Sequence, residues 1–479
     1  MSAATGDTGR AHQGWTLLLA SLGVFMSALD ALVVATALPV LRDDLDASLA
    51  DLEWTVNGYN LAFACIILTG AALGDRFGRR RLYVIGIGVF TAASAAAALA
   101  PTTSVLLAAR VVQGCGAGIM FPLTLTLITA AFPPYRRGAA IGIWSGISGS
   151  AVALGPVIGG AIIEGISWEW IFWFNVPVGL VLMPLAASKL TESHGSRTRL
   201  DIIGMLLIAA GLAAMTWGLI RAPSEGWTSA GALSMLILGA TLVAAFLMWE
   251  RRAADPMLPL VYFKLRGFTT ANIAVFCTFA SLLGALFVMT QLLQTAFRLS
   301  PLSAGLLILP WTGVPAFVAP LAGRFADRIG NRPLIAAGLS LQAIGLSWAA
   351  ALIEPGMGYR PLTTALLVAG IGIALCLPTV ANAVMTAVPP TDSGVASAAN
   401  AAMRQLGGVL GVAVVAAVFA GQGSYASTAS FIDGCVPALY VAALLSGLGI
   451  PAALLVPPRQ PPRTATAHAP AHSVRDEFS

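Results

Sequence analysis

Two related stretches decide the fold, and the first, residues 74–80, reads Gly-Asp-Arg-Phe-Gly-Arg-Arg. The second, residues 323–332, reads Gly-Arg-Phe-Ala-Asp-Arg-Ile-Gly-Asn-Arg. Each is a short charged connection between two long apolar runs. The shared Asp-Arg-x-Gly core includes Asp75 and Arg76 in one copy and Asp327 and Arg328 in the other. Repeats of this kind predict a chain with two related halves.

Composition excludes a soluble protein. The chain has 479 residues, of which 57% are hydrophobic and 10% charged, whereas a soluble domain has about 45–50% apolar and about 25% charged residues. At roughly 34 residues for a span and its connection, this length holds about 14 transmembrane helices.

Apolar runs bounded by Pro, Gly and charged residues predict fourteen membrane spans. The first half contains spans at 15–38, 54–74, 82–100, 104–131, 139–163 and 170–188, and a two-span insert follows at 201–220 and 229–249. The second half contains spans at 269–292, 302–323, 333–353, 361–387, 394–420 and 435–456. We therefore predict an all-α membrane protein with two six-helix halves and two extra helices between them.

The basic residues predict the orientation. Of the 26 Lys and Arg residues, 20 fall in tails and connections on one side of the predicted membrane and 4 on the other. The positive-inside rule places the first set, with both termini, in the cytoplasm. The predicted parts are a cytoplasmic tail (1–14), an N-terminal half (15–190), an insert with its connections (191–266), a C-terminal half (267–456) and a disordered cytoplasmic tail (457–479).

Several kinds of chemistry lack the residues they need. The five cysteines are isolated and the four histidines lie in tails or connections, which argues against a disulfide framework, a metal site and a histidine proton relay. Both lysines precede Leu, so there is no nucleotide-binding P-loop. The basic residues form no patch for nucleic acid. We expect no cofactor, and lipid, protons and small lipophilic molecules as the partners.

Asp30 is the only acidic residue in the interior of a predicted span, since Asp201 stands at the very first position of its span. A carboxylate in hydrocarbon costs at least about 2.5 to 3.5 kcal/mol, so it indicates a functional site, here for proton coupling. Arg110 lies at a similar depth, since Asp30 is about 12 Å and Arg110 about 9 Å from the same membrane surface. We predict that they pair. The alternatives are a protonated Asp30 bonded to a neighbouring helix and an Arg110 that reaches the outer headgroups.

Arg404 is the second embedded cation, and Ser393, Ser397 and Asn400 precede it at helical spacing. These residues share one face of the helix, which lines a wet cavity or binds a neighbouring helix. The sequence leaves both possibilities open.

Small residues recur every four positions in the fifth span, first at Gly138, Gly142, Gly146 and Ser150. A shifted row follows at Ala151, Gly155 and Gly159, beside Pro156 and Gly160. Such rows allow helix backbones to approach closely, and Pro156 adds a kink where the row shifts.

Span position suggests a substrate cavity lined by polar and aromatic residues, although core packing is the simpler explanation for each. The embedded charges sum to plus one, which favours neutral or monocationic lipophilic substrates and leaves an anionic aromatic one open. The candidate residues are Met26, Tyr59, Gln113, Trp144, Gln291, Asn382 and Arg404.

The motifs together resemble the fourteen-span drug/proton antiporter family of the major facilitator superfamily. Residues 74–80 and 323–332 resemble the superfamily's cytoplasmic motif, and residues 110–116 its span-four motif. Residues 154–160 (Leu-Gly-Pro-Val-Ile-Gly-Gly) resemble the antiporter motif, and residues 29–39 and 168–177 are similar to further family signatures. The resemblance covers nearly the whole chain except its tails. Ala71, Thr36 and Glu169 depart from the usual residues.

The resemblance implies a role for each motif. Asp30 would accept the proton and Arg110 would modulate it. The gate motif (Gly74, Asp75, Arg76, Gly78, Arg79 and Arg80, with Asp327 and Arg328) would hold the halves together on the cytoplasmic side, and Gly78 would form its tight turn. Gly155, Pro156, Gly159 and Gly160 would form the antiporter motif.

The expected activity is proton-coupled export of lipophilic drugs or antibiotics by alternating access, in a bacterial plasma membrane. An exporter dedicated to one metabolite or antibiotic of its host is the alternative. An intramembrane enzyme would need a nucleophile with a base, or metal ligands, at membrane depth, and the sequence supplies neither.

Overall fold

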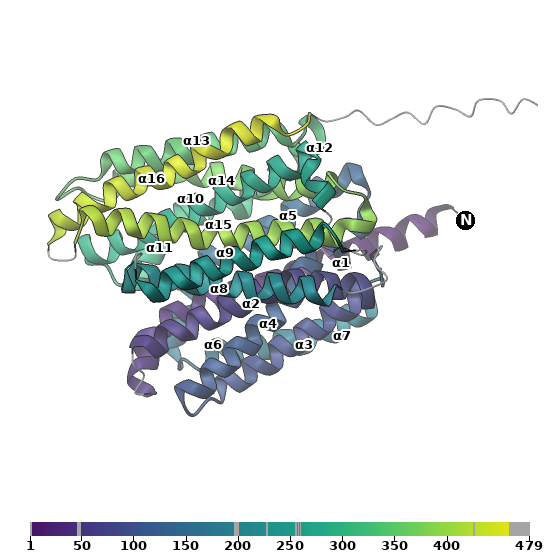
Figure 1. Ribbon diagram of the computed structural model, residues 1–479, viewed down its shortest axis with the longest axis horizontal. Coiled ribbons are helices and arrows are strands. Elements are labelled where there is room, and N and C mark those ends of the chain that lie inside the picture. The colour runs from purple at the N-terminus through teal and green to yellow at the C-terminus, as the bar shows by residue number, and fades with distance from the viewer. Residues whose placement is uncertain are drawn as a thin grey trace, which may run out of the picture.

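The computed structural model describes residues 2–45, 49–195, 201–226, 229–253, 256, 258, 260–424 and 427–458. Every regular element in these ranges is a helix, and the long helices lie side by side in one bundle (Figure 1). The first half contains α1 (Ser2–Asp44), α2 (Leu49–Phe77), α3 (Arg79–Ala98), α4 (Thr103–Ala131), α5 (Pro134–Gly165), α6 (Trp170–Trp173) and α7 (Asn175–Lys189).

The insert contains α8 (Ile202–Glu225) and α9 (Ala230–Glu250), followed by the short η1 (Leu260–Lys264). The second half contains α10 (Arg266–Gln291), η2 (Leu292–Ala296), α11 (Pro301–Thr312), α12 (Val314–Ile329), α13 (Asn331–Leu352), α14 (Arg360–Thr386), η3 (Pro390–Asp392), α15 (Ser393–Gln422) and α16 (Thr428–Leu455).

The helices account for all the predicted spans. Twelve stretches among the described residues are long and apolar enough to cross a membrane. α8 contains a shorter apolar stretch, Ile202–Gly218, and α5, with 32 residues, occupies the position of the fifth predicted span. The protein is a multi-pass membrane protein with the predicted all-helical architecture.

Three helix boundaries differ from the prediction. α1 begins at Ser2, so the predicted tail 1–14 continues the first helix. The sixth span starts with the separate turn α6 before α7. The tenth span is divided into α11 and α12 at Gly313, because Pro315, in the first turn of α12, has no N–H to continue the helical hydrogen bonds.

One end of the bundle, which we call the basic end, contains the connections α2–α3 and α12–α13. Both connections turn at a glycine with positive φ, 106° at Gly78 and 88° at Gly330. Each glycine lies three residues after its aspartate, Asp75 or Asp327. The two repeats therefore have the same backbone turn, which side chains with a Cβ rarely adopt.

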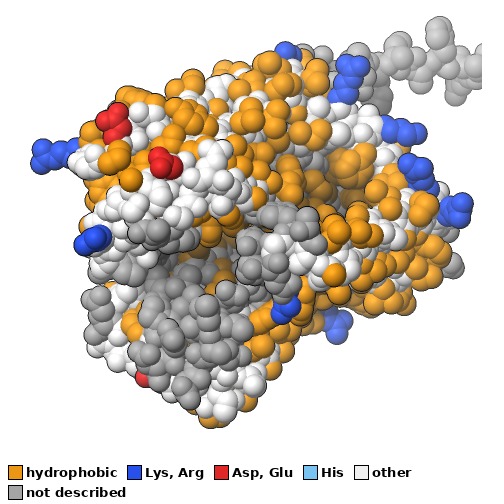
Figure 2. Space-filling model, turned by 60° about the vertical axis from the view of Figure 1, so that its left-hand side comes forward, with side chains coloured by type: hydrophobic (Ala, Val, Ile, Leu, Met, Phe, Trp, Pro, Cys, Tyr) orange, Lys and Arg blue, Asp and Glu red, His pale blue; other side chains and the backbone are white. Residues whose placement is uncertain are grey.

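Among the described residues, the apolar core that the two halves share lies near the basic end. That core combines residues such as Ile141 and Trp144 of α5 with Val380 of α14 and Ala398 of α15. Near the opposite end, one cluster lies wholly within the first half and another wholly within the second. Figure 2 turns the opposite end forward and shows it hollowed near its middle. The halves are thus joined at the basic end.

The insert lies along the seam between the halves. α8 packs against α9, against α2 of the first half and against α15 of the second. Trp54 of α2 and Trp217 of α8 have ring centroids 4.3 Å apart. The insert therefore contacts a helix from each half.

Candidate functional site: two embedded arginines and a closed basic end

Asp75 connects α2 to the second half at the basic end. Its Oδ1 accepts a hydrogen bond from Arg79 Nε at 2.9 Å and forms an ion pair with Arg79 Nη2 at 2.8 Å, and both side chains are buried. Arg79 Nη2 also donates to the carbonyl of Thr391, 3.3 Å away, just before α15. The Asp75 carboxylate occupies the space that a Cβ on Gly394 would need, at the start of α15. A negative charge is favourable at a helix N-terminus, so this contact joins the halves.

Asp327 makes the reciprocal contact. Its two carboxylate oxygens accept from the backbone N–H groups of Gly138 and Ala139, each at 2.9 Å, near the start of α5. Each half thus places an aspartate from its repeated motif on a helix of the other half. Arg76 and Arg328 are exposed, and Arg76 stacks on the Phe77 ring at 5.3 Å.

Glu192, which sequence reasoning missed, stabilises the Gly78 turn. Its carboxylate accepts from the backbone N–H groups of Arg80 at 2.9 Å and Arg81 at 3.1 Å, at the start of α3. A Cβ on Gly78 would lie 2.7 Å from the Glu192 Cδ. Only the helix-capping preference for acidic residues could have suggested Glu192, and no pattern fixes the partner of an acid 112 residues away.

The glycine row of α5 faces α12 of the second half. A Cβ on Gly142 would lie 2.7 Å from the carbonyl of Ala319, and a Cβ on Gly323 would lie 2.8 Å from the Cα of Gly142. Gly74 also allows a close approach, here to Leu123 of α4. Backbone lies against backbone where Gly142 meets Gly323, and a side chain on either glycine would collide with the facing helix.

The motif residues further along α5 face elsewhere. A Cβ on Gly155 would lie 2.8 Å from the Cβ of Leu32 in α1, within the same half. Gly159 is buried and Gly160 is half-buried, while the side chain of Pro156 lies outside the described part of the structure.

Asp30 and Arg110 form the ion pair that their equal depth predicts. Arg110 Nη1 donates to Asp30 Oδ2 at 2.5 Å, and neither side chain has solvent-accessible surface. Gln113 Nε2 at 2.8 Å and Asn175 Nδ2 at 2.7 Å both donate to Asp30 Oδ1. All three partners donate, which is the arrangement that an ionised carboxylate needs. The network joins α1, α4 and α7 within one half.

Arg110 is held on its other sides as well. Its Nε donates to the carbonyl of Thr55 at 3.2 Å, and its Nη1 donates to Gln113 Oε1 at 2.6 Å. Its guanidinium carbon lies 4.3 Å from the Tyr59 ring centroid and 5.8 Å from that of Phe172. Breaking a buried ion pair on one side costs about 3 to 5 kcal/mol, so Asp30 and Arg110 stabilise each other while both are charged.

Arg404 has a different environment. Its guanidinium carbon lies 4.4 Å from the ring centroid of Phe279, 5.3 Å from Phe121 and 5.9 Å from Trp144. Phe121 and Trp144 belong to the first half and Phe279 to the second, so Arg404 lies between the halves. Among the residues that the structure describes, none gives it a hydrogen bond or an ion pair.

The four polar residues predicted to share one face of α15 have different surroundings in the structure. Ser397 Oγ donates to the carbonyl of Pro122 at 2.5 Å, which is a bond between helices of the two halves. Ser393 and Asn400 are buried, and within the described residues the Ser393 hydroxyl and the Asn400 Nδ2 have no partner. Ser397 therefore forms a contact between helices, whereas Arg404 keeps part of its surface accessible.

The predicted cavity residues fall into three groups. Tyr59 and Gln113 surround the Asp30 pair, and Trp144 contacts Arg404. Met26 packs in the core of the first half with residues such as Tyr83. Gln291 ends α10, and Asn382 lies one turn from the end of α14, so these two belong to neither arginine site.

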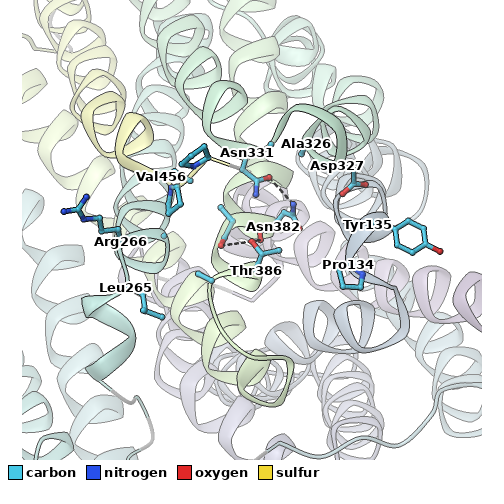
Figure 3. A pocket seen from close by; sticks show the side chains of 16 residues that line it. Pro134, Tyr135, Leu265, Arg266, Ala326, Asp327, Asn331, Asn382, Thr386 and Val456 are labelled. Carbon is cyan, nitrogen blue, oxygen red and sulfur yellow. Dashed lines mark hydrogen bonds between the residues drawn. The ribbon is translucent and has the colours of Figure 1, made fainter. Parts of the chain in front are cut away.

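Asn382 lines a separate cavity of about 760 Å³ at the basic end. Figure 3 shows Asn382 near Asn331 and Thr386, with Arg266 on one side and Asp327 on the other. Asn382 Nδ2 donates to Asn331 Oδ1 at 3.0 Å. The walls come mainly from the second half, and the start of α5 adds Pro134 and Tyr135.

Asn175 is the second functional residue that sequence reasoning missed. It lies in the quoted signature at 168–177, but nothing in the sequence shows that α7 would turn its amide towards α1. Ser94 of α3 completes the network by accepting from Gln113 Nε2 at 2.7 Å. Clusters of three or more His, Cys, Asp or Glu that could hold a metal are absent from the described residues.

Comparison with known proteins gives the family. The profile of the Major Facilitator Superfamily matches residues 20–292 and 271–476. The chain is 36% identical to the tetracenomycin C resistance and export protein of Streptomyces glaucescens, over 85% of this chain and 76% of that protein. It is 38% identical to the multidrug resistance protein Stp of Mycobacterium tuberculosis (85% and 75%). It is 34% identical to the methylenomycin A resistance protein of Streptomyces coelicolor (83% of each).

Solved structures agree on the fold. The proton:xylose symporter XylE superposes with a TM-score of 0.66 at 16% identity, over 94% of this chain and 97% of that one. The human organic anion transporter MFSD10 gives a TM-score of 0.66 at 15% identity, over 92% and 99%. With these matches, the chain belongs to the major facilitator superfamily and is a membrane transporter for small molecules, not an enzyme.

Proposed function

We propose that this transporter exports lipophilic drugs or antibiotics in exchange for protons, by alternating access between its two halves. The names of its relatives, which include export, multidrug resistance and antibiotic resistance proteins, support the substrate class. The Asp30 network supports the proton coupling. No nucleotide or cofactor takes part, because the proton gradient supplies the energy.

The observation that carries the proposal is a carboxylate without solvent contact whose three partners all donate. These partners come from α4 and α7, while Asp30 belongs to α1. If α1 moves relative to α4 and α7, the carboxylate loses donors, and its charged form becomes costly in a low-dielectric site. Asp30 then takes up a proton. Helix movement and protonation are thereby coupled, and Arg110 sets the strength of the coupling.

The basic end is the cytoplasmic end in this proposal, with both termini inside a bacterial cell and the protein in its plasma membrane. The excess of Lys and Arg at that end supports this orientation. The contacts of Asp75 and Asp327 then close the cytoplasmic side. The moving bodies are the halves at 15–190 and 267–456, with 191–266 between them.

The test of proton coupling is Asp30→Asn in the full-length protein, reconstituted into liposomes with an imposed pH difference. Asn keeps an acceptor for Gln113 and Asn175 but cannot exchange a proton. We expect gradient-driven transport to fall at least about 100-fold, the range expected when an essential proton-transfer group is lost, while downhill exchange of substrate continues. Asp433→Asn, the same change on an exposed carboxylate, is the matched control. Gradient-driven transport by Asp30→Asn at the rate of this control would refute the role of Asp30.

An exporter dedicated to a single host-made antibiotic is the second candidate. The names of two relatives, for tetracenomycin C and for methylenomycin A, favour it. Competition between chemically unrelated substrates separates the two functions. A broad exporter shows mutual inhibition by many compounds, whereas a dedicated one responds to a single scaffold.

A further inference from the structure

We propose that Arg404, with Phe121, Trp144 and Phe279, recognises planar aromatic substrates that have one negative charge, such as a carboxylate or an acidic hydroxyl. This inference rests on the proposed export function and names the class of molecule exported. It differs from the expectation from embedded charge alone, which favoured neutral or monocationic compounds.

The charges at membrane depth favour an anionic occupant. Asp30, the acidic residue of the first span, is committed to Arg110, Gln113 and Asn175. Its charge is therefore not available to a cationic substrate in this conformation. Arg404, by contrast, has only aromatic rings around its guanidinium, and no acceptor among the described residues. A partly buried guanidinium without an anion is costly, and a substrate anion reduces that cost.

Arg404 lies just beyond the buried part of α15. Every residue of α15 from Ser393 to Ala402 is buried, so this part of the helix is sealed between its neighbours. The next four residues, from Met403 to Leu406, are all partly exposed, and so are Phe121 and Phe279. Arg404 therefore lies in the first turn above the closed region, where a molecule that enters between the halves meets it.

Asn400 provides a second donor that lacks a partner in the described part of the chain. Asn400 lies one turn before Arg404 on the same face of α15. It is 2% exposed, and within the described residues its Nδ2 has no hydrogen-bond partner. Two donors without acceptors on one helical face match an oxygen anion better than they match a cation.

The rings decide the shape of the occupant. Phe63 and Phe121 meet edge to face with centroids 5.5 Å apart, and Phe121 meets Trp144 at 6.1 Å. These faces and edges provide stacking surface for a flat ring system. The planar guanidinium offers two parallel N–H donors, which fit a carboxylate or a pair of neighbouring oxygens.

The experiment measures binding by calorimetry to the full-length protein in nanodiscs, without a pH gradient, and uses empty nanodiscs as the blank. The probes are anthraquinone-2-carboxylate and its neutral carboxamide, which have the same ring system and differ in charge. We expect the wild-type protein to bind the carboxylate at least about ten-fold more tightly, the discrimination that one desolvated charge pair provides. Arg404→Gln should bring the two affinities within about two-fold, mainly by weakening carboxylate binding.

Two further variants complete the test. Arg324→Gln changes an exposed arginine at the basic end and should keep the wild-type preference. Arg404→Lys keeps the charge and controls for a loss of stability in the Gln variant. It should keep part of the preference. A wild-type protein that binds the carboxamide as tightly as the carboxylate overturns the proposal, and so does an Arg404→Gln variant with an unchanged preference.

The outcome is separable from that of the proposed function. Asp30→Asn tests coupling and should leave the preference for the carboxylate unchanged, because Asp30 has its partners within the first half. Normal gradient-driven transport in Asp30→Asn, together with a lost preference in Arg404→Gln, would refute proton coupling through Asp30 and support the substrate site. The reverse pair of results would refute the substrate site alone.

Discussion

Arg110 and Arg404 are both arginines within the membrane-spanning bundle, and both lie against aromatic rings, but only Arg110 has polar partners within the described part of the chain. Arg110 contacts a carboxylate, an amide oxygen and a backbone carbonyl, all within the first half. Arg404 contacts three aromatic rings from both halves and no acceptor among the described residues. A cation that is paired with an anion of its own half is committed to that partner in this conformation. A cation at the seam is available to a molecule that enters there.

Stability provides the largest expected difference between the two arginines. Arg110→Gln leaves Asp30 as a buried charge without its cation, so the free energy of unfolding should fall by about 3 to 5 kcal/mol. Arg404→Gln removes a cation that has no anion, and the lost ring contacts are offset by relief of its desolvation, so the change should stay within about 1 kcal/mol. Thermal unfolding in detergent measures both.

The double variant Asp30→Asn with Arg110→Gln tests whether the loss of stability comes from an unpaired buried charge. It removes both charges, and it should be more stable than Arg110→Gln alone because no unpaired ion remains. Equal melting temperatures for Arg110→Gln and Arg404→Gln would show that the two environments are energetically equivalent, which contradicts the predicted difference in stability.

Asn175→Ala should have the next largest effect. It removes a donor 2.7 Å from the Asp30 carboxylate, and hydrogen bonds to charged groups contribute about 1.5 to 3 kcal/mol. Asn331→Ala is the matched control, since Asn331 pairs with the neutral amide of Asn382 and should lose only about 0.5 to 1.5 kcal/mol. The ratio of the two losses, read from thermal unfolding, reports whether Asp30 is charged in this conformation. A smaller loss for Asn175→Ala than for Asn331→Ala would argue that it is neutral.

Phe279→Leu should have the smallest effect, and only at the Arg404 site. The Phe279 ring is the closest of the three to the guanidinium, and one ring contributes about 0.5 to 1.5 kcal/mol to an aromatic or cationic partner. We expect binding of anthraquinone-2-carboxylate to weaken by about three- to ten-fold. Phe325→Leu, at an exposed ring of α12, should leave binding unchanged. Equal binding by both variants would remove Phe279 from the site.

The membrane fold could be predicted from the sequence because its signals are local. Apolar runs, helix-breaking residues and the excess of basic residues on one side define the spans without knowledge of their neighbours. The unpredicted features depend on sequence-distant contacts or weak signals. The apolar pattern does not show whether the polar residues before the first span belong to α1. The division at Gly313 falls within an otherwise apolar run, so hydrophobicity does not reveal it.

The Asp30 pair could be predicted for a similar reason. Helical rise converts sequence position into depth, and two opposite charges at one depth have few other partners. Sequence position does not show in the same way towards which neighbouring helix a side chain points. Span position therefore suggested Met26, Gln291 and Asn382 for the same cavity as Arg404, although each faces a different part of the bundle. The rings around Arg404 come from three helices of both halves, and only the docking of those halves brings them together.

The glycine seam between α5 and α12 limits which spontaneous mutations the protein tolerates. Any single-base change in the first two positions of a glycine codon replaces hydrogen with at least a methyl group, or stops translation. At Gly142 and Gly323 the surrounding backbone leaves no room for that methyl group. Spontaneous mutants along this seam should be null alleles, so populations that acquire new resistance spectra should carry their changes around the aromatic rings and not between these two helices.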